Sequence, residues 1–331
     1  MEIGSSITTE LSVDAPFSYD VWLQRLVRSN ARASAVETIG KRHYAYSMQG
    51  SRRVLLVTFE NIQRTRREVA DGGPRGLSLV QPWGWSLLSL LSVDDTWFRD
   101  GDVYDYFDEL AAAGYFEAFD RVVFYGSGPS SAYAAAAFSV AAPGAVVLAI
   151  SPQATLDPRR AGWDDRFPEA RRTRFDTRYG YAPDMLQACE RAFILYDPES
   201  RLDAVHASLF ADEYVATIAM RGLGPHLETE LMAMGILPRI LGVAAAGTLS
   251  PAVISKLYRK RRNNGHWLNG LAHRLTHRNR PWLTAVACRS ILRRYPSTKL
   301  ERLYDQSTSM LRRQGRELPP LSKSSTATAR G

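Results

Sequence analysis

The sequence contains only two cysteines, Cys189 and Cys288, which lie far apart and have no neighbouring cysteine or paired histidine. This scarcity excludes a disulfide framework and any cysteine-based zinc or iron–sulfur site, and it fits a reducing compartment. The first residues, MEIGSSITTELSVD, lack the basic and then apolar run of a signal peptide. We therefore expect a cytoplasmic protein.

Charge is absent from Val122 to Leu156, a run of 35 residues that is long enough to span a membrane. Glycine and proline interrupt this run, at Gly126, Gly128, Pro129, Pro143 and Gly144. Because β-branched residues also gather at both ends, the pattern favours a strand, a tight turn, a helix and a second strand. No transmembrane span is expected.

Acidic residues are scarce in the last part of the chain. Residues 239–331 hold 19 Lys or Arg and three Asp or Glu, whereas residues 1–238 hold 23 and 31. Such a basic segment either solvates exposed helix faces or binds an acidic partner, and both interpretations stay open. Nucleic acid is not favoured, because no aromatic-interleaved stripe or nucleic-acid motif accompanies the charge.

Apolar strand-like runs alternate with helical periodicity over most of the 331 residues. Strands are predicted at 43–47, 54–60, 85–92, 121–125, 146–151, 193–197 and 215–220. Helices are predicted at 17–30, 103–113, 131–142, 228–241, 251–263, 267–278, 282–294 and 298–313. This alternation predicts an α/β fold with a mainly parallel sheet covered by helices, followed by an all-α appendix.

These patterns divide the chain into four segments. We predict a helical lead-in at 1–40, an α/β domain at 41–246, a basic helical appendix at 247–314 and a disordered tail at 315–331. The appendix weakly resembles one tetratricopeptide-type hairpin between Trp267 and Pro296.

One strand-to-helix turn can carry chemistry. The strand RVVFY is followed by Gly126-Ser-Gly-Pro-Ser-Ser-Ala, a setting of small residues like that of a nucleophile elbow. In one register Ser130 is the nucleophile and the amide of Ser131 is an oxyanion donor, with Asn61 as the candidate second donor. Counted from Gly126 instead, the nucleophile position falls on Gly128, which has no side chain. Both registers stay open, a working site and a decayed elbow.

Two further residues complete a candidate triad by their chain order. Asp197 ends the strand FILYD, and His226 follows the last predicted strand, VATIAM. In hydrolases of the α/β type, the order along the chain is serine, acid and histidine. His226 would then take the proton from Ser130, and Asp197 would orient the imidazole.

On these residues the chain resembles the α/β-hydrolase superfamily, over about residues 43–245. More narrowly it resembles bacterial hydrolase-like domains with a small-residue elbow and the motifs Ser151-Pro152-Gln153 and Asp157-Pro158. The resemblance implies a context of glycan assembly and a helical-repeat tail. Look-alikes sometimes carry the label phosphoadenosine phosphosulfate reductase, but the pyrophosphate loop and the C-terminal cysteine motif of that chemistry are missing.

The segment 157–181 interrupts the α/β alternation and is predicted to form a lid. It holds seven arginines and five aromatic residues, a combination that suits an anionic or carbohydrate ligand. The residues expected to bind substrate are Gln153, Arg159, Arg160 and Trp163. Alternatively, the acidic residues of the segment pair with its arginines internally, and the two interpretations are about equal.

Other chemistries receive weaker support. Gly126-Ser-Gly-Pro-Ser-Ser also approximates a dinucleotide-binding turn, but the acidic residue required after the next strand is missing. His206 is interpreted as a packed or surface residue rather than a rival base. No cofactor and no metal site is expected. The leading hypothesis is an ester or acyl hydrolase acting on a glycan-related or anionic small molecule. The alternative is a non-catalytic binding or assembly module whose basic appendix docks an acidic protein.

Overall fold

The computed structural model describes residues 18–29, 33–68 and 73–319. The chain divides into two compact units, Met1–Val122 and Val123–Gly331. The predicted segments 1–40, 41–246, 247–314 and 315–331 stay predictions, and residues 320–331 of the tail lie outside the described part.

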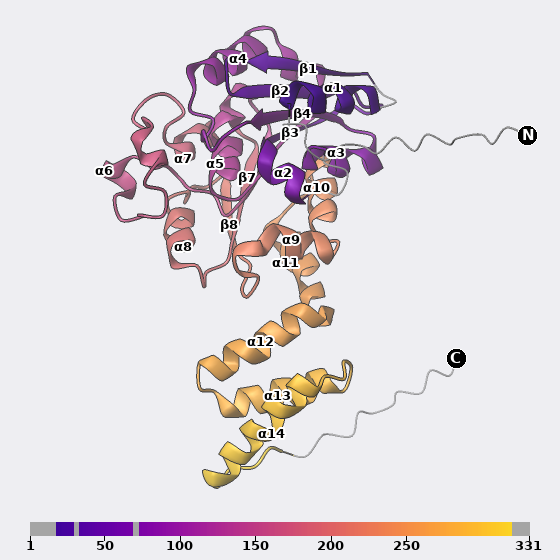
Figure 1. The fold of residues 1–331 in the computed structure, drawn as a ribbon, viewed down its shortest axis with the longest axis vertical. Helices are drawn as coiled ribbons and strands as arrows, with labels where there is room; N and C mark the ends of the chain where they lie inside the picture. The colour runs from indigo at the N-terminus through magenta and orange to yellow at the C-terminus, as the bar shows by residue number, and fades with distance from the viewer. Residues whose placement is uncertain (1–17, 30–32, 69–72, 320–331) are drawn as a thin grey trace, which may run out of the picture. The chain divides into compact units, whose positions relative to one another are not determined.

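In its described residues, the first unit contains four strands and four α-helices (Figure 1). The strands are β1 (Ser34–Ile39), β2 (His43–Met48), β3 (Val54–Asn61) and β4 (Ser86–Ser92). The helices are α1 (Tyr19–Ser29), α2 (Ile62–Glu68), α3 (Arg75–Val80) and α4 (Gly101–Ala112). β2 pairs antiparallel with both β1 and β4, whereas β3 pairs parallel with β4.

The strand β1 is absent from the sequence prediction. Its residues alternate between half-buried and exposed positions and include Glu37 and Thr38. As an edge strand it needs apolar residues on one face only, so its apolar signal is weak. β4, in contrast, is buried at every position, and its apolar run correctly predicts a strand at 85–92.

The next strand, β5 (Arg121–Ser127), begins in the last two residues of the first unit and continues into the second. The second unit also holds β6 (Val146–Ile150), β7 (Arg191–Tyr196) and β8 (Val215–Ala219). All neighbouring pairs among them are parallel. The helices up to β8 are α5 (Pro129–Phe138), α6 (Pro158–Ala161), α7 (Ala182–Met185) and α8 (Arg201–Ser208). The helices after β8 are α9 (Leu227–Ala233), α10 (Leu237–Ala245), α11 (Pro251–Tyr258), α12 (Gly265–His277), α13 (Pro281–Leu292) and α14 (Thr298–Arg313).

The strand order is β1-β2-β4-β3-β5-β6-β7-β8, so the sheet has eight strands and is mainly parallel. Helices lie between successive parallel strands, and from β8 to residue 319 the regular elements are all helices. The predicted fold class, an α/β sheet with a helical C-terminal region, is confirmed.

The alanine-rich helix α5 packs directly on β6 and α7. Every residue from Ala132 to Phe138 is buried, because alanine side chains let the helix backbone approach its neighbours closely. This packing fixes the direction in which the turn between β5 and α5 points.

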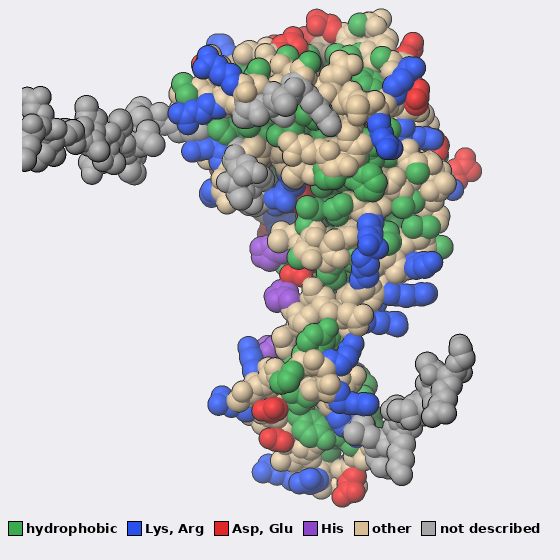
Figure 2. Space-filling model, turned by 90° about the vertical axis from the view of Figure 1, so that its right-hand side faces the viewer, with side chains coloured by type: hydrophobic (Ala, Val, Ile, Leu, Met, Phe, Trp, Pro, Cys, Tyr) green, Lys and Arg blue, Asp and Glu red, His purple; other side chains and the backbone are tan. Residues whose placement is uncertain are grey.

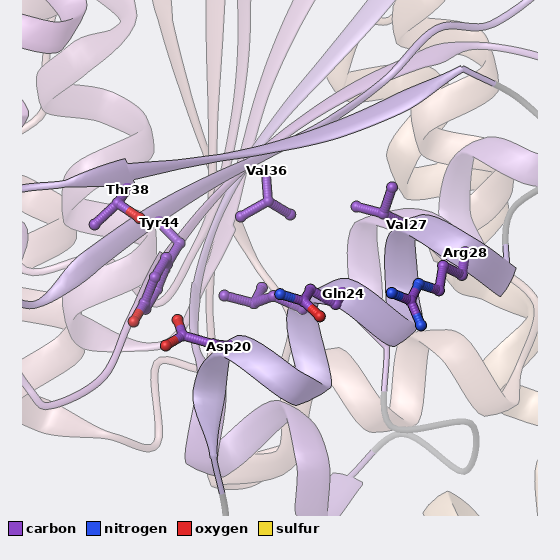
Figure 3. A pocket seen from close by; sticks show the side chains of 8 residues that line it. Asp20, Gln24, Val27, Arg28, Val36, Thr38 and Tyr44 are labelled. Atoms are coloured by element: carbon purple, nitrogen blue, oxygen red, sulfur yellow. The ribbon is translucent and has the colours of Figure 1, made fainter.

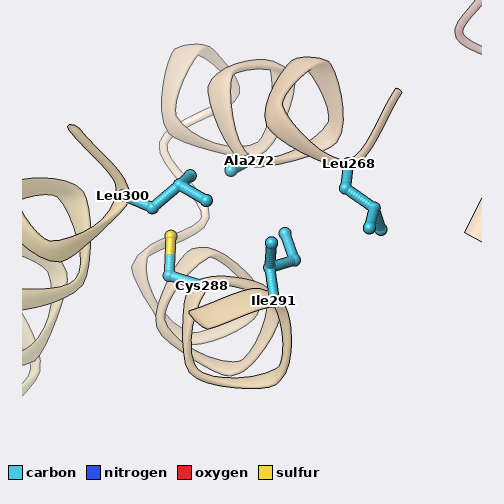
Figure 4. Close-up of a cluster of buried hydrophobic side chains, with 5 residues drawn as sticks. All are labelled: Leu268, Ala272, Cys288, Ile291 and Leu300. Atoms are coloured by element: carbon cyan, nitrogen blue, oxygen red, sulfur yellow. The ribbon is translucent and has the colours of Figure 1, made fainter. Parts of the chain in front are cut away.

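The helices after β8 depart from the prediction at two places. The predicted helix at 251–263 is α-helical only to Tyr258 and continues as a 3₁₀ helix, Arg259–Asn263. The predicted helix at 228–241 is two helices, α9 and α10, because Gly235 between them has a left-handed φ of 61°. The last three helices share a small apolar core, formed by Leu268, Ala272, Cys288, Ile291 and Leu300 (Figure 4). Cys288 is therefore a packed core residue. Burial raises the pKa of its thiol.

None of the helices in the described part of the chain combines the length and apolar character that crossing a bilayer requires. The uncharged run from Val122 to Leu156 contains most of β5, all of α5 and β6, and the loops that join them.

Candidate functional site

The turn between β5 and α5 has the sharp geometry of an elbow. β5 ends at Ser127 and α5 begins at Pro129, so Gly128 alone forms the tip, with φ 86° and ψ 174°. Two positions before the tip, a side chain on Gly126 would collide with the backbone carbonyl of Ser131. Strand and helix therefore cross so closely that this position tolerates only glycine.

The structure thus places Gly128, and not Ser130, at the tip of the turn. Ser130 is the second residue of α5 and is half-buried. The backbone amide of the tip residue has an acceptor within the protein, because Gly128 N donates to the carbonyl of Ile150 at 2.9 Å. Ser131 lies in the first turn of α5, where helix amides have no acceptor within the helix. The roles of Ser130 as nucleophile and Ser131 as oxyanion donor stay predictions.

The sequence predicted Asp197 as the last residue of its strand, but β7 ends one residue earlier, at Tyr196. Asp197 directly follows the carboxyl end of β7 and is buried. Its Oδ1 accepts a hydrogen bond from the amide of Glu199 at 3.0 Å. Its Oδ2 accepts from the amides of Gly222 at 2.9 Å and Gly224 at 2.7 Å. Both glycines have left-handed φ angles, 81° and 63°, which turn their amides toward the carboxylate. Asp197 therefore fixes the loop that follows β8.

His226 ends a short 3₁₀ turn, Gly224–His226, directly after that loop, and its side chain is exposed. Within the described ranges, no hydrogen bond joins the side chains of Ser130, Asp197 and His226. The structure brings Asp197 to the backbone of the His226 loop, and the imidazole takes no part in that contact.

The same loop also anchors the helices that follow the sheet. The carbonyl of Arg221 accepts hydrogen bonds from the Tyr258 hydroxyl at 2.7 Å and from Trp267 Nε1 at 3.2 Å. The carbonyl of Gly222 accepts from Arg274 Nη1 at 3.2 Å. The loop is thus held by Asp197 and by side chains of α11 and α12.

The predicted substrate-binding residues of the lid mostly contact other residues of the lid. The guanidinium of Arg159 bonds the carboxylate of Asp157, with Nη2 2.8 Å from Oδ2. Arg160 stacks over the ring of Tyr181 at 4.0 Å, and Trp163 Nε1 donates to the Arg160 carbonyl. Their role toward a substrate stays a prediction.

Ion pairs inside the lid account for much of its charge. Arg166 pairs with Asp164, Arg172 with Glu169, and Arg174 with Asp176. The hydrogen bonds from Arg174 hold the pKa of Asp176 below its usual range. These three arginines therefore form the internal ion pairs that the second interpretation of the lid expects.

A buried polar network, centred on His206 and Asp164, joins the lid to α8. His206 Nε2 lies 3.0 Å from Asp164 Oδ2, and His206 Nδ1 accepts a hydrogen bond from the amide of Ala154 at 3.1 Å. Arg166 bridges Asp164 to Asp203 and to the side-chain oxygen of Gln153. Since Nδ1 is an acceptor, His206 is neutral with its proton on Nε2.

Burial lowers the pKa of His206 to about 4, although the neighbouring Asp164 acts in the opposite direction. Burial alone would raise the pKa of Asp164, but hydrogen bonds from Arg166 hold it below its usual range. Gln153, a predicted substrate-binding residue, is fully buried in this network, and its Nε2 has no hydrogen-bond partner in the described structure.

Asn61, the candidate second oxyanion donor, ends β3 in the first unit. Its Oδ1 accepts a hydrogen bond from the amide of Arg64 at 3.1 Å and so caps α2. The preceding Glu60 accepts hydrogen bonds from the amides of Arg75 and Gly76, which begin α3. The role of Asn61 as an oxyanion donor stays a prediction.

A separate pocket of about 440 Å³ lies in the first unit between α1 and the strands β1 and β2 (Figure 3). Val36 lines it from the sheet, Asp20 and Tyr44 face each other at one side, and Arg28 lies at the other. Burial and the Asp20 carboxylate raise the pKa of Tyr44. Nothing in the sequence analysis pointed to this pocket.

No protein-family model matches this sequence, and no curated protein matches it. Among solved structures, an esterase of Pyrobaculum calidifontis aligns at 16% identity over 70% of this chain and 90% of its own, with a TM-score of 0.41. A carboxyl esterase of Tuber melanosporum aligns at 13% identity over 62% and 84%, with a TM-score of 0.40. The capsule O-acetyltransferase of Neisseria meningitidis serogroup A aligns at 9% identity over 64% and 96%, with a TM-score of 0.42.

These similarities concern the fold alone. The α/β-hydrolase type of architecture, as the sequence predicted, is carried by the chain's own strand order and by its sharp turn after β5. What the turn can do chemically depends on the residues that occupy it.

Proposed function

We propose that this chain is a non-catalytic scaffold of the α/β-hydrolase type that serves as a binding or assembly module through its basic helical appendix. The observation that carries the proposal is Gly128 at the tip of the turn between β5 and α5. Nucleophilic catalysis on this fold needs an oxygen or sulfur atom at that tip, and glycine supplies none.

The surroundings of the tip support this conclusion. A catalytic histidine needs a carboxylate that orients its ring. Both carboxylate oxygens of Asp197 instead accept hydrogen bonds from backbone amides, and His226 is exposed. The loop between them serves as an anchoring point for α11 and α12.

The appendix carries the charge that a partner would recognise. Residues 247–314 contain 15 Lys or Arg and two acidic residues. Figure 2 shows one face of this helical part, on which Lys and Arg side chains are spread with few acidic ones among them. Four of its basic side chains are clustered and have no acidic partner in the described structure: Lys256, Arg259, Lys260 and Arg262. An acidic protein surface complements such a cluster.

Ester hydrolysis is the second candidate, because the sharp elbow and the chain order of Ser130, Asp197 and His226 favour it. Its substrate would be a glycan-related or anionic ester or acyl compound. For this activity the hydroxyl of Ser130 would have to take the role of the missing tip side chain.

A fluorophosphonate probe applied to the folded full-length protein separates the two functions. We expect no covalent labelling, because no serine occupies the tip. Labelling that disappears in Ser130→Ala but persists in the matched Ser131→Ala variant would overturn the proposal in favour of a serine hydrolase.

Binding is tested with poly-L-glutamate as the acidic probe. Neutralising the four clustered residues to glutamine should weaken binding about tenfold or more, since each lost exposed ion pair weakens binding by up to several-fold. The matched control neutralises four exposed basic residues elsewhere, at Arg25, Lys41, Arg52 and Arg201. Equal weakening in both variants would mean that only net charge matters, and the docking role of the appendix would be rejected.

A further inference from the structure

A pocket of about 390 Å³ is lined by side chains of α13 and α14 and by residues 316–319, which follow α14. Arginines enter it from three places in the chain, Arg289 on α13, Arg312 on α14 and Arg316 in the segment after α14. Its volume is within the range of pockets that hold small organic molecules.

Two of these arginines are held in place by other groups. Arg289 Nη1 donates a hydrogen bond to the carbonyl of Pro319 at 2.7 Å. The guanidinium of Arg316 lies over the ring of Trp282, 5.2 Å from its centre. Positioned guanidinium groups lose less entropy when they bind an anion than free ones do.

The charge of the pocket is not neutralised by the protein. In the part of the chain that the structure describes, none of Arg289, Arg312 and Arg316 forms an ion pair. Among the described residues that line the pocket, Glu317 is the only acidic one, so three positive charges meet a single negative one. A phosphoryl group, with a charge between −1.5 and −2 at neutral pH, complements this excess.

The rest of the lining is suited to an organic body attached to that group. Leu311 is buried at the wall, Leu318 is half-buried, and Tyr304 adds an aromatic ring with a hydroxyl. Guanidinium forks bind phosphoryl oxygens in pairs, while Tyr304 and Leu318 offer contacts to the body of the ligand.

We propose that this pocket binds a small organic molecule that carries a phosphoryl group, with Arg289, Arg312 and Arg316 as the ligands of its oxygens. The proposal does not depend on whether the turn between β5 and α5 is catalytic, or on whether the appendix binds an acidic protein. It concerns a defined cavity lined by three arginines, two of them held in place, and not the overall charge of the helices.

The test is calorimetric titration of the full-length protein with phenyl phosphate. We expect saturable binding of one molecule per chain. Arg312→Gln and Arg316→Gln should each weaken it about tenfold or more, because each removes charged hydrogen bonds. Both side chains are exposed, so these variants should keep the fold. Arg302→Gln is the matched control, since Arg302 is exposed on α14 and does not line the pocket. It should change affinity less than twofold.

Three results would overturn the proposal. The first is the absence of saturable binding to the wild-type protein. The second is equal weakening in the pocket variants and in Arg302→Gln, which would indicate diffuse attraction. The third is binding of benzoate as tight as that of phenyl phosphate, which would show that the site does not select a phosphoryl group.

Discussion

Two regions of the second unit each contain a histidine and a buried aspartate, and they use them differently. At the lid, His206 is fully buried and bonds Asp164 through Nε2 and the Ala154 amide through Nδ1. At the ends of β7 and β8, Asp197 is buried but bonds three backbone amides, while His226 points to solvent. The pairing expected of a catalytic site thus occurs where no nucleophile was predicted.

The difference shows how burial decides the use of a carboxylate. A buried carboxylate needs donors, and either a side chain or the backbone satisfies it. Asp164 takes its donors from Arg166 and His206 and so fixes the lid, whereas Asp197 takes glycine amides and so fixes a loop. The same residue types therefore act in both places as connectors of loops.

The largest expected effect comes from breaking the lid network at its centre. Asp164→Ala leaves His206 and Arg166 without their shared partner inside the protein. We expect the free energy of unfolding to fall by about 3–5 kcal/mol, measured by urea denaturation. Asp165→Ala, at the exposed neighbouring position, should change it by less than about 0.5 kcal/mol. A similar loss in both variants would contradict the central role of Asp164.

The second effect depends on pH. His206 has a pKa of about 4 when folded, against an ordinary value of 6.5. Because the unfolded chain binds the proton more readily, the contribution of His206 to stability is complete above pH 6.5 and is lost as the pH falls toward 4. The loss amounts to about 3 kcal/mol.

Urea denaturation between pH 7 and pH 4 measures this dependence. Burial also lowers the pKa of His43 in the first unit to about 4, so the wild-type slope contains both histidines. His206→Gln should lose the part that belongs to His206 and retain the parts that belong to His43 and to carboxylates with shifted pKa values, such as Glu60 and Asp176. An unchanged slope in this variant would show that His206 is not the titrating group.

The third effect tests Asp197. Asp197→Asn keeps the size of the side chain but replaces one carboxylate oxygen with an NH₂ group. This group cannot accept a hydrogen bond, so at least one of the backbone amides that now donate to Asp197 loses its acceptor. We expect a loss of about 1–3 kcal/mol and faster hydrogen exchange at the amides of Gly222 and Gly224. The exposed Asp184→Asn is the control and should alter neither quantity. Unchanged exchange in Asp197→Asn would contradict the anchoring role.

Local patterns in the sequence were sufficient for much of the fold. The helix predicted at 298–313 has the same bounds as α14, and the buried run VVLAIS contains β6, because apolar periodicity reports burial directly. The edge strand β1 escaped prediction, since half of its residues face solvent. The break at Gly235 was missed because a glycine signals a left-handed turn only once its packing is known.

The sequence predicted the site less completely than the fold. It placed Asp197 and His226 at the ends of the correct strands, but it left both elbow registers open, because the pattern of small residues does not mark the end of β5 at Ser127. The pair of Asp164 and His206 spans 42 positions, and the internal ion pairs of the lid depend on side-chain directions. Periodicity and spacing carry no information on such contacts.

The smallest expected effect concerns His226, and it tests whether the two histidines really differ. His226→Ala removes an exposed side chain that forms no hydrogen bond in the described structure, so the free energy of unfolding should change by less than about 0.5 kcal/mol. His206→Ala, measured beside it, should lose several times more, because it removes one donor to the buried Asp164 and leaves the Ala154 amide without an acceptor. If the two variants were equally destabilised, His226 would be held by contacts that its exposure does not suggest. The β8 loop would then depend on its imidazole as well as on Asp197, and a catalytic arrangement of the two would again merit a test.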